Sequence, residues 1–111
     1  MTPQPRTLDH PDRSEIRLED VLHALSDPVR LQVVCFLAAG GESSCSAIDL
    51  AVSKSTTTHH FRVLREAGVI RQVYRGTAKM SSLRHEDLDA LFPGLLDTVV
   101  TAYDAQRARL S

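Results

Sequence analysis

Residues 53–68, SKSTTTHHFRVLREAG, constrain the fold of this chain more than any other stretch, because their polar and apolar side chains separate on a helix. One stripe of the helical wheel for residues 55–66 consists of Thr57, Phe61 and Leu64, with His60 at its edge. The opposite stripe consists of Ser55, His59, Arg62 and Glu66. The pattern predicts a helix that ends at Gly68, rests its apolar side on a core and turns its polar groups outward.

Short segments on both sides complete a recognisable arrangement. AIDLAV at 47–52 predicts a short helix before the polar-faced one, and VIRQVY and AKMSSL after it flank the turn-forming residues RGT. The two runs predict a β-hairpin with Arg75 and Lys79 beside its tip. A short helix, a turn and a polar-faced helix make a helix-turn-helix, and a basic hairpin that follows them resembles a wing.

The first half of the chain predicts two helices that form the core. Apolar residues from Ile16 to Leu25 recur mostly at three- and four-residue spacings, as in an amphipathic helix. SDP at 26–28 ends that helix and begins another, because Ser or Asp caps a helix and proline suits its first turn. The second helix, VRLQVVCFLAA, is apolar on most sides and ends at Gly40, so we expect it at the centre of the core.

The final third predicts a long helical region that Pro93 kinks or divides. Its acidic start suits the positive end of a helix dipole, and a long apolar stripe follows at helical spacing. A terminal helix of so small a domain has little surface of its own left to cover, which favours a partner subunit. The residues expected at a dimer interface are Leu18, Leu22, Leu91, Leu95, Leu96 and Val99.

Charge is segregated along the chain, although the net charge is only −1. Between Lys54 and Arg84 there are seven basic residues and one acid, Glu66, which leaves a local charge of +6. Affinity for a polyanion depends on local cation density rather than on overall charge. The segment therefore indicates a phosphate-facing surface, with a merely solvated face as the alternative.

Length and composition predict a single soluble domain. We expect residues 1–14, which hold three prolines and little apolar surface, to form a flexible N-terminal arm, and residues 15–111 to form one domain. Neither a signal peptide nor a membrane span is evident, so a cytoplasmic location without membrane association is expected. Cys35 and Cys45 are then expected to be free thiols.

The chain resembles the ArsR/SmtB family of bacterial winged helix-turn-helix regulators. The resemblance rests on LSDPVRL, on STTTHHFRVLREAGVI and on the RG at the tip of the hairpin, and it covers roughly residues 16–110. It implies a mainly α fold with a small β-hairpin, in the order helix, helix, helix, helix, strand, strand, helix. It also implies a homodimer joined through its first and last helices, which binds a pseudo-palindromic double-stranded DNA operator and favours repression over activation.

The residues expected to bind DNA come from the polar-faced helix and the hairpin. Hydroxyl, imidazole and guanidinium groups bond to phosphates and base edges, whereas His60 is expected to pack inside the domain. The predicted DNA-binding residues are Lys54, Ser55, Thr56, Thr58, His59, Arg62, Arg75 and Lys79.

The sequence departs from the family's best-known metal-sensing patterns. Cys45 stands alone where such relatives carry a Cys-x-Cys pair, and residues 97–111 contain no histidine. A divalent metal, nickel or zinc, would have to use the remaining histidines and acids, among which His85 and Asp89 share a helical face. The candidate metal ligands are His10, Glu15, His23, His85 and Asp89. An organic ligand, a protein co-regulator, a thiol switch at Cys45 or the absence of any effector are the alternatives.

Two other classes of protein were compared with this interpretation. An enzyme is not expected, because the chain contains no nucleophile elbow, phosphate-binding glycine loop or His-Glu-x-x-His helix. A winged helix can also serve as a protein-interaction module or a partner-dependent regulator, since one fold supports both uses. Steep salt dependence of binding would distinguish DNA from an apolar protein partner.

Overall fold

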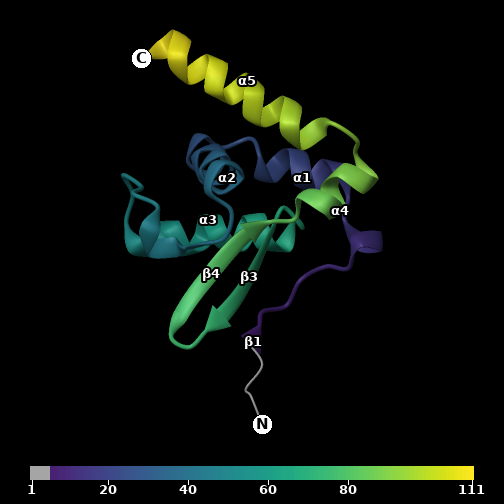
Figure 1. Ribbon diagram of the computed structural model, residues 1–111, viewed down its shortest axis with the longest axis vertical. Helices are drawn as coiled ribbons and strands as arrows, with labels where there is room; N and C mark the ends of the chain where they lie inside the picture. Colours follow the sequence, from purple (N-terminus) through teal and green to yellow (C-terminus); the bar gives the residue numbers. More distant parts are fainter. Residues whose placement is uncertain (1–5) are drawn as a thin grey trace.

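The computed structural model describes residues 6–111, which form helices stacked in layers with a projecting hairpin (Figure 1). Helix α5 lies on one side, α2 and α1 lie in the middle, and α3 lies on the other side. The helices are α1 (Leu18–Ala24), α2 (Pro28–Gly40), α3 (Lys54–Glu66), α4 (His85–Leu91) and α5 (Leu95–Leu110), with short 3-10 turns η1 (Arg13–Glu15) and η2 (Cys45–Ala47). The strands are β1 (Arg6–Thr7), β2 (Ser43–Ser44), β3 (Ile70–Arg75) and β4 (Ala78–Leu83).

Helix α2 is the central core helix, as its composition predicts. Val33, Val34 and Leu37 are almost fully buried, and Phe61 and Leu64 of α3 join the same apolar cluster. The helix begins where the SDP motif predicts, since Oδ1 of Asp27 accepts hydrogen bonds from the backbone N–H groups of the second and third residues after it, at 2.8 and 3.2 Å. Partial burial opposes ionisation of Asp27, but these two bonds outweigh it and hold the pKa of the carboxyl below its ordinary value.

Helix α3 has the boundaries and the buried side that its sequence predicts. Ser53 caps its start, where the side-chain oxygen accepts from the backbone N–H of Thr56 at 3.2 Å. Gly68 ends it in a left-handed conformation (φ 86°), and its N–H and that of Val69 bond back to the last turn of the helix at 3.1 and 2.9 Å. This Schellman motif turns the chain directly into β3.

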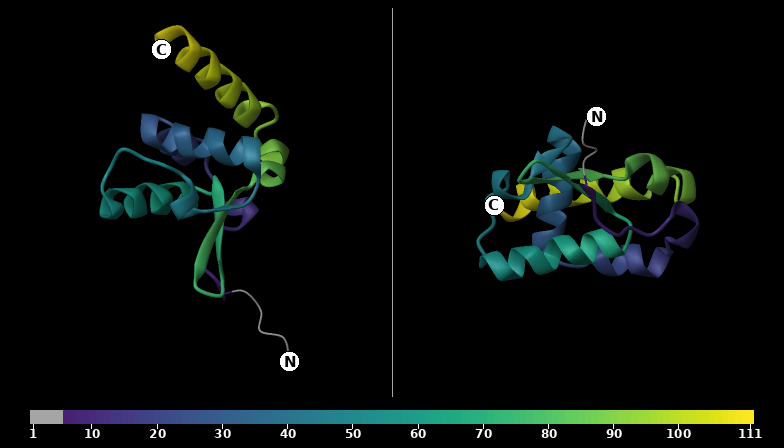
Figure 2. Two further views of the ribbon diagram at one scale, coloured as in Figure 1. Left: turned by 60° about the vertical axis from the view of Figure 1, so that its left-hand side comes forward. Right: turned by 90° about the horizontal axis from the view of Figure 1, so that it is seen from below.

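The predicted hairpin is formed and lies at the centre of a four-stranded antiparallel sheet in the order β1-β3-β4-β2. Strands β3 and β4 pair from Ile70 opposite Leu83 to Arg75 opposite Ala78. Gly76 has a φ of 64°, so the turn at the tip needs a residue without a β-carbon. Turned views show the hairpin projecting away from the helices beyond α3 (Figure 2).

The prediction of a short helix at residues 47–52 is wrong. Ser43 and Ser44 pair with β4, Cys45–Ala47 form only one 3-10 turn, and no helix follows until Lys54. The backbone is extended at Ile48, whose side chain is buried in the core. Pairing with the sheet and burial of Ile48 therefore override a local helical preference that six residues are too few to sustain.

The C-terminal region divides into α4 and α5 around Pro93 and Gly94, as predicted. Gly94 has a φ of 78°, which changes the direction of the chain between the two helices. One expected interface residue, Leu96, is only 5% exposed and belongs to the core of this chain. The prediction that Leu96 lies at a dimer interface is therefore corrected, because this part of α5 packs onto the core of its own chain.

The described part of the N-terminal segment lies along the sheet. Arg6 pairs with Tyr74 and Thr7 with Val73, so β1 extends the edge beside β3. Residues 1–5 of the expected arm lie outside the described residues. The boundary at residue 14 stays a prediction, but the segment from Arg6 onward is paired with the domain rather than detached from it.

Among the described residues, no single helix has both the length and the apolar character needed to cross a membrane. Helices α1 and α2 pass this test only when taken as a pair, and the pair is bent by 99°.

We expect Gly68→Ala to destabilise the fold by about 2 to 5 kcal/mol, through left-handed strain and a steric clash. An added β-carbon would lie 2.6 Å from Cγ1 of Ile16, closer than packed atoms approach. Gly94→Ala is the matched control, because it has the same strain but open space and should cost only about 1 to 2 kcal/mol. Urea unfolding at one protein concentration measures both, and equal losses would contradict the clash.

Candidate nucleic-acid interface

The polar face of α3 is exposed along the whole helix. All six residues predicted to bind DNA from this helix are exposed, namely Lys54, Ser55, Thr56, Thr58, His59 and Arg62. The opposite side is buried through His60, Phe61 and Leu64. Helix α3 lies on the side of the molecule opposite α5, next to the projecting hairpin (Figure 1). The structure therefore presents one uncovered helix face rich in hydrogen-bonding groups beside a basic hairpin.

Hydroxyl groups at the start of α3 are arranged by bonds within the helix. Ser53 Oγ donates to Oγ1 of Thr56 at 2.9 Å, so Thr56 keeps its own hydroxyl proton for another acceptor. Thr58 donates its hydroxyl proton to the backbone carbonyl of Lys54 at 3.0 Å, which leaves it as an acceptor only. Thr56 thus suits a phosphate oxygen, whereas Thr58 suits a donor such as a base amino group.

A buried guanidinium holds α3 against the first two helices. Arg30 of α2 is 7% exposed, and its Nε and Nη2 donate to the carbonyls of Ala24 (2.7 Å) and His23 (3.3 Å) at the end of α1. Its Nη1 lies 3.1 Å from Nδ1 of His60 on α3. Because a guanidinium only donates, Nδ1 of His60 accepts this bond and the ring proton of a neutral imidazole lies on Nε2. The prediction that His60 packs and bonds inside the domain is confirmed.

The adjacent His59 ring lies outside this contact. Its centroid is 5.8 Å from that of His60, with the ring planes tilted by 54°, and the side chain is exposed. The two neighbouring histidines therefore have different surroundings, one on the outward face of α3 and one in the core.

The two basic residues of the hairpin differ in their contacts. Arg75 forms a two-pronged ion pair with Glu42, with Nε–Oε1 and Nη2–Oε2 distances of 2.9 and 3.2 Å. The hydrogen bond from Arg75 to Glu42, with their opposite charges, raises the pKa of the guanidinium. Lys79 lies with Nζ 5.8 Å from the centre of the Tyr74 ring. A DNA phosphate that binds Arg75 would have to compete with the carboxylate of Glu42. The sequence gives no sign of this ion pair, because Glu42 lies 33 positions before Arg75.

A second buried polar contact joins the end of α3 to the sheet. Gln72 is fully buried, and its Oε1 accepts from Nη1 of Arg65 at 2.8 Å. Its Nε2 donates to Oγ of Ser81 at 3.1 Å and lies 3.7 Å from the sulfur of Cys45. The partners of this glutamine lie on three other segments, so the sequence carries no signal of the contact. The contact couples the orientation of α3 to the hairpin.

Both cysteines are free thiols, as expected. Cys35 is buried in α2, and this burial raises the pKa of its thiol. Cys45 is partly buried and lies 3.8 Å from Oγ of Ser81, within the contact that includes Gln72.

The expected metal ligands do not assemble. Within residues 6–111, no group of three His, Cys, Asp or Glu side chains is placed to hold a metal ion. Nε2 of His85 bonds to Asp97 of α5 at 3.0 Å, whereas Oδ1 of Asp89 accepts from the backbone N–H of Gly94 at 3.1 Å. The other three candidates, His10, Glu15 and His23, lie in the N-terminal segment, in η1 and in α1.

The remaining expected interface residues form two sets. Leu18 and Leu22 of α1 are 44% and 47% exposed, which is unusual for large apolar side chains in this structure. Leu91, Leu95 and Val99 are half-buried against the core and retain a partly exposed edge. The first helix therefore supplies the more exposed apolar surface.

Comparison with known proteins places this arrangement in a family. A helix-turn-helix domain family model matches residues 25–73. The uncharacterised HTH-type transcriptional regulator YceK of Bacillus subtilis is 34% identical over 82 residues, which are 71% of this chain and 82% of that protein. The arsenical resistance operon repressor of Staphylococcus xylosus is 32% identical over 73 residues, which are 65% of this chain and 70% of that protein.

Solved structures show the same fold. The transcriptional repressor BigR of Xylella fastidiosa superposes with a TM-score of 0.55 at 26% identity, over 68% of this chain and 85% of that one. A regulator described as ArsR family superposes with a TM-score of 0.56 at 22% identity, over 84% and 88%, and supports the fold alone.

The polar face of α3, the hairpin beside it and these likenesses define the class of protein, a winged helix-turn-helix transcriptional regulator that binds DNA. The chain belongs to the ArsR/SmtB family of such regulators. The expected fold class and family are thereby confirmed.

His10 binds the N-terminal segment to the hairpin. Its Nε2 accepts from the backbone N–H of Gln72 at 2.9 Å. Burial is the main cause that lowers the pKa of His10, and it outweighs a hydrogen bond with the backbone of Leu8 that raises the pKa. Positive charges add to the lowering, and they come from Arg84, Arg65 and Arg71. The attached segment therefore holds a neutral imidazole.

We expect attachment of this segment to weaken as the pH falls below about 6.5, the ordinary pKa of histidine. The detached state binds a proton in that range and the attached state does not, so this stabilisation is present above about pH 6.5 and is lost on acidification. The measurement is the hydrogen-exchange protection factor of the Gln72 amide between pH 7.5 and 5. His10→Phe is the control, since it should show low protection at every pH. Equal protection of the parent at both pH values would contradict the assignment.

Proposed function

We propose that this chain is a homodimeric repressor that reads a pseudo-palindromic operator with one α3 helix in each of two successive major grooves. The exposed face of α3, set on a buried apolar side and held by Arg30 through His60, carries this proposal. Arg62 lies on that face beyond the first helical turn, where a guanidinium contacts guanine or phosphate. Ser55, Thr56 and Lys54 at the start of the helix suit phosphates.

The hairpin acts as a wing that contacts the DNA backbone. Lys79 and Arg75 lie beside the tip of the hairpin. The hairpin itself projects beyond the helices (Figure 2). Lysine and arginine on a phosphate position a protein without reading its sequence. Because Glu42 neutralises Arg75 in the unbound protein, we assign the larger part of the wing's contribution to Lys79.

Dimerisation supplies the second half-site. Leu18 and Leu22 form an exposed apolar edge on α1, and the partly exposed edges of Leu95 and Val99 lie on α5. Burial of such side chains between two copies removes apolar area from water, and the two-fold symmetry of the dimer matches that of a palindrome.

Repression is favoured by the relatives. The names of the Staphylococcus xylosus protein and of BigR both describe repressors. Because both of these relatives are repressors, we assign repression to this chain.

Use of the winged helix to bind another protein is the second candidate. The described residues include four exposed large apolar side chains, and none lies on α3 or on the hairpin; they are Leu18, Leu22, Phe36 and Leu110. A protein-docking helix would be expected to carry such an anchor at its centre. The polar composition of α3 therefore favours nucleic acid, and a steep loss of affinity with salt would support it.

We expect Arg62→Ala to lower operator affinity by about 1 to 3 kcal/mol and to relax selectivity at one symmetric position, because guanine contacts specify sequence. Selection of bound duplexes from a random pool, followed by binding titrations, measures both effects. Lys79→Ala is the matched comparison: it should weaken all duplexes alike and reduce the slope of log affinity against log salt by about 1 unit per subunit. If Arg62→Ala leaves affinity and sequence preference unchanged, α3 does not read DNA as proposed.

Leu22→Glu should separate the dimer while each subunit stays folded, since the side chain is exposed in the single chain. Burial of a carboxylate close to its symmetry mate should weaken dimerisation by roughly 3 kcal/mol or more. Light scattering measures the mass, and operator affinity should fall with it. Ser14→Glu adds the same charge at an exposed position outside the apolar edge and should stay dimeric. A dimeric Leu22→Glu protein would place the interface elsewhere.

A further inference from the structure

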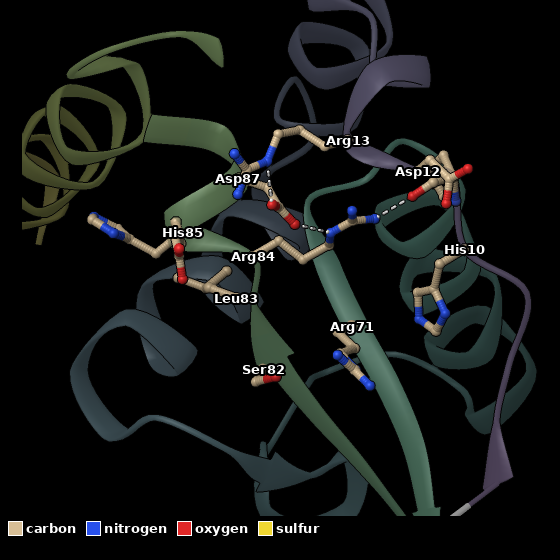
Figure 3. Close-up of a pocket in the computed structure, with 11 residues that line it drawn as sticks. His10, Asp12, Arg13, Arg71, Ser82, Leu83, Arg84, His85 and Asp87 are labelled. Carbon is tan, nitrogen blue, oxygen red and sulfur yellow. Dashed lines mark hydrogen bonds and ion pairs between the residues drawn. The ribbon is translucent and has the colours of Figure 1, made fainter. Parts of the chain in front are cut away.

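A polar cavity lies where the N-terminal segment, the hairpin and α4 meet. Its volume is about 500 Å³, and its walls are residues 10–13, Arg71 of β3 and residues 82–87. Figure 3 shows these three parts of the chain converging on one space. None of its walls belongs to the exposed face of α3, so the cavity is separate from the surface that we assign to DNA reading.

Two of the three arginines in the cavity, Arg13 and Arg84, share one carboxylate, that of Asp87. Nε of Arg13 and Nε of Arg84 contact the two carboxylate oxygens of Asp87 at 2.7 and 3.0 Å. Arg84 also donates from Nη1 to the carbonyl of Pro11 at 2.7 Å. Bonds from Arg13 and Arg84 hold the pKa of Asp87 below its ordinary value, the bond from Arg13 being the larger cause, so the carboxylate stays charged. This group is a closed structural contact that joins the segment to α4.

Arg71 is the third arginine of the cavity, and it does not contact Asp87. It is exposed, and within residues 6–111 it takes part in none of the ion pairs. Ser82 lies opposite Arg71 in the pairing of β3 with β4, so the two side chains stand on the same face of the hairpin. Figure 3 shows Arg71 on its strand below Arg84 and His10, with Ser82 beside it. A guanidinium and a hydroxyl are thus adjacent at the cavity with their donors directed to no acceptor of the described chain.

Arginine side chains act on His10 at this side of the cavity. The charged groups that lower the pKa of His10 are the arginines Arg84, Arg65 and Arg71. The other carboxylates of the cavity, Asp12 and Glu86, are exposed side chains on the segment and on α4. An anion beside Arg71 would therefore meet a guanidinium that takes part in none of the ion pairs within residues 6–111.

We propose that this cavity binds a small oxyanion, a phosphate or carboxylate group, through the guanidinium of Arg71 and the hydroxyl of Ser82. Arginine matches such groups because two parallel N–H donors meet two oxygens. The cavity walls include His10 and His85 of the predicted metal set, but the groups assigned to the ligand are Arg71 and Ser82, which are not metal candidates. The cavity volume is sufficient for inorganic phosphate or a small organic acid.

Occupation of the site would stabilise attachment of the N-terminal segment. An anion at Arg71 offsets the positive charge beside His10 and fills the space between the segment and β3. Any effect of the ligand on operator affinity rests on the proposed function. Such an effect would act through the strands of the wing, or through α4 and then α5, which we assign to the dimer. Binding itself requires neither DNA nor a dimer.

The test is an NMR titration of the full-length protein, without DNA, with sodium phosphate and then with sodium acetate at constant ionic strength. We expect saturable shifts in the amides of Arg71 and Ser82 and in the Nε–H of Arg71. Arg71→Gln should weaken phosphate binding about tenfold or more, because it removes a charge-assisted hydrogen bond. Arg109→Gln removes an exposed arginine at the end of α5 and should bind as the parent does.

Shifts that grow linearly without saturation, or equal affinities of Arg71→Gln and the parent, would overturn the proposal. DNA is tested separately by operator titrations in phosphate-free buffer. If Arg71→Gln weakens operator binding and the parent binds neither phosphate nor acetate, the oxyanion at Arg71 is a DNA phosphate and the small-ligand proposal fails. Saturable phosphate binding that is lost in Arg71→Gln supports the site even if the protein binds no operator.

Discussion

The buried guanidinium of Arg30 is the contact on which the position of α3, the helix that we propose reads DNA, depends. It satisfies two carbonyls at the end of α1 and the acceptor nitrogen of His60, so one side chain sets the angle between the first helix, the core helix and α3. A buried charge is costly unless its donors are used, and here three directed bonds compensate it. Because removal of any one partner would leave a buried polar group unsatisfied, the three helices are held in a single arrangement rather than in a loosely packed set.

A second polar contact, at Gln72, extends this rigidity to the wing. Arg65 near the end of α3 bonds to Gln72 of β3, which bonds across the hairpin to Ser81. These bonds join α3 to the wing, which suits the proposal that the two meet a groove and the neighbouring backbone together. The N-terminal segment lies on the same hairpin through His10, and the polar cavity lies beneath it. A ligand in that cavity would act on the wing without touching α3.

Local patterns were reliable where one element decided its own structure. The separation of side chains in residues 55–66 predicted α3 and the packed His60, and Pro28, Gly68 and Pro93 mark the helix boundaries that the structure shows. The prediction for residues 47–52 was wrong, because pairing of Ser43 and Ser44 with β4 replaced the helix. Leu96 was assigned to a partner because periodicity shows that a residue is apolar but not which surface covers it.

The sequence by itself determined the helices, the hairpin, the polar face of α3 and the basic character of the segment that carries them, since these follow from side-chain period, capping residues and local charge. Only the tertiary structure decided which charges remain unpaired. Glu42 meets Arg75 from 33 positions away and Asp87 meets Arg13 from 74 positions away, so the chain neutralises these arginines through folding, while Arg71 keeps no such partner within the described residues. Ion pairs between distant residues depend on how elements pack, and no local period records that packing.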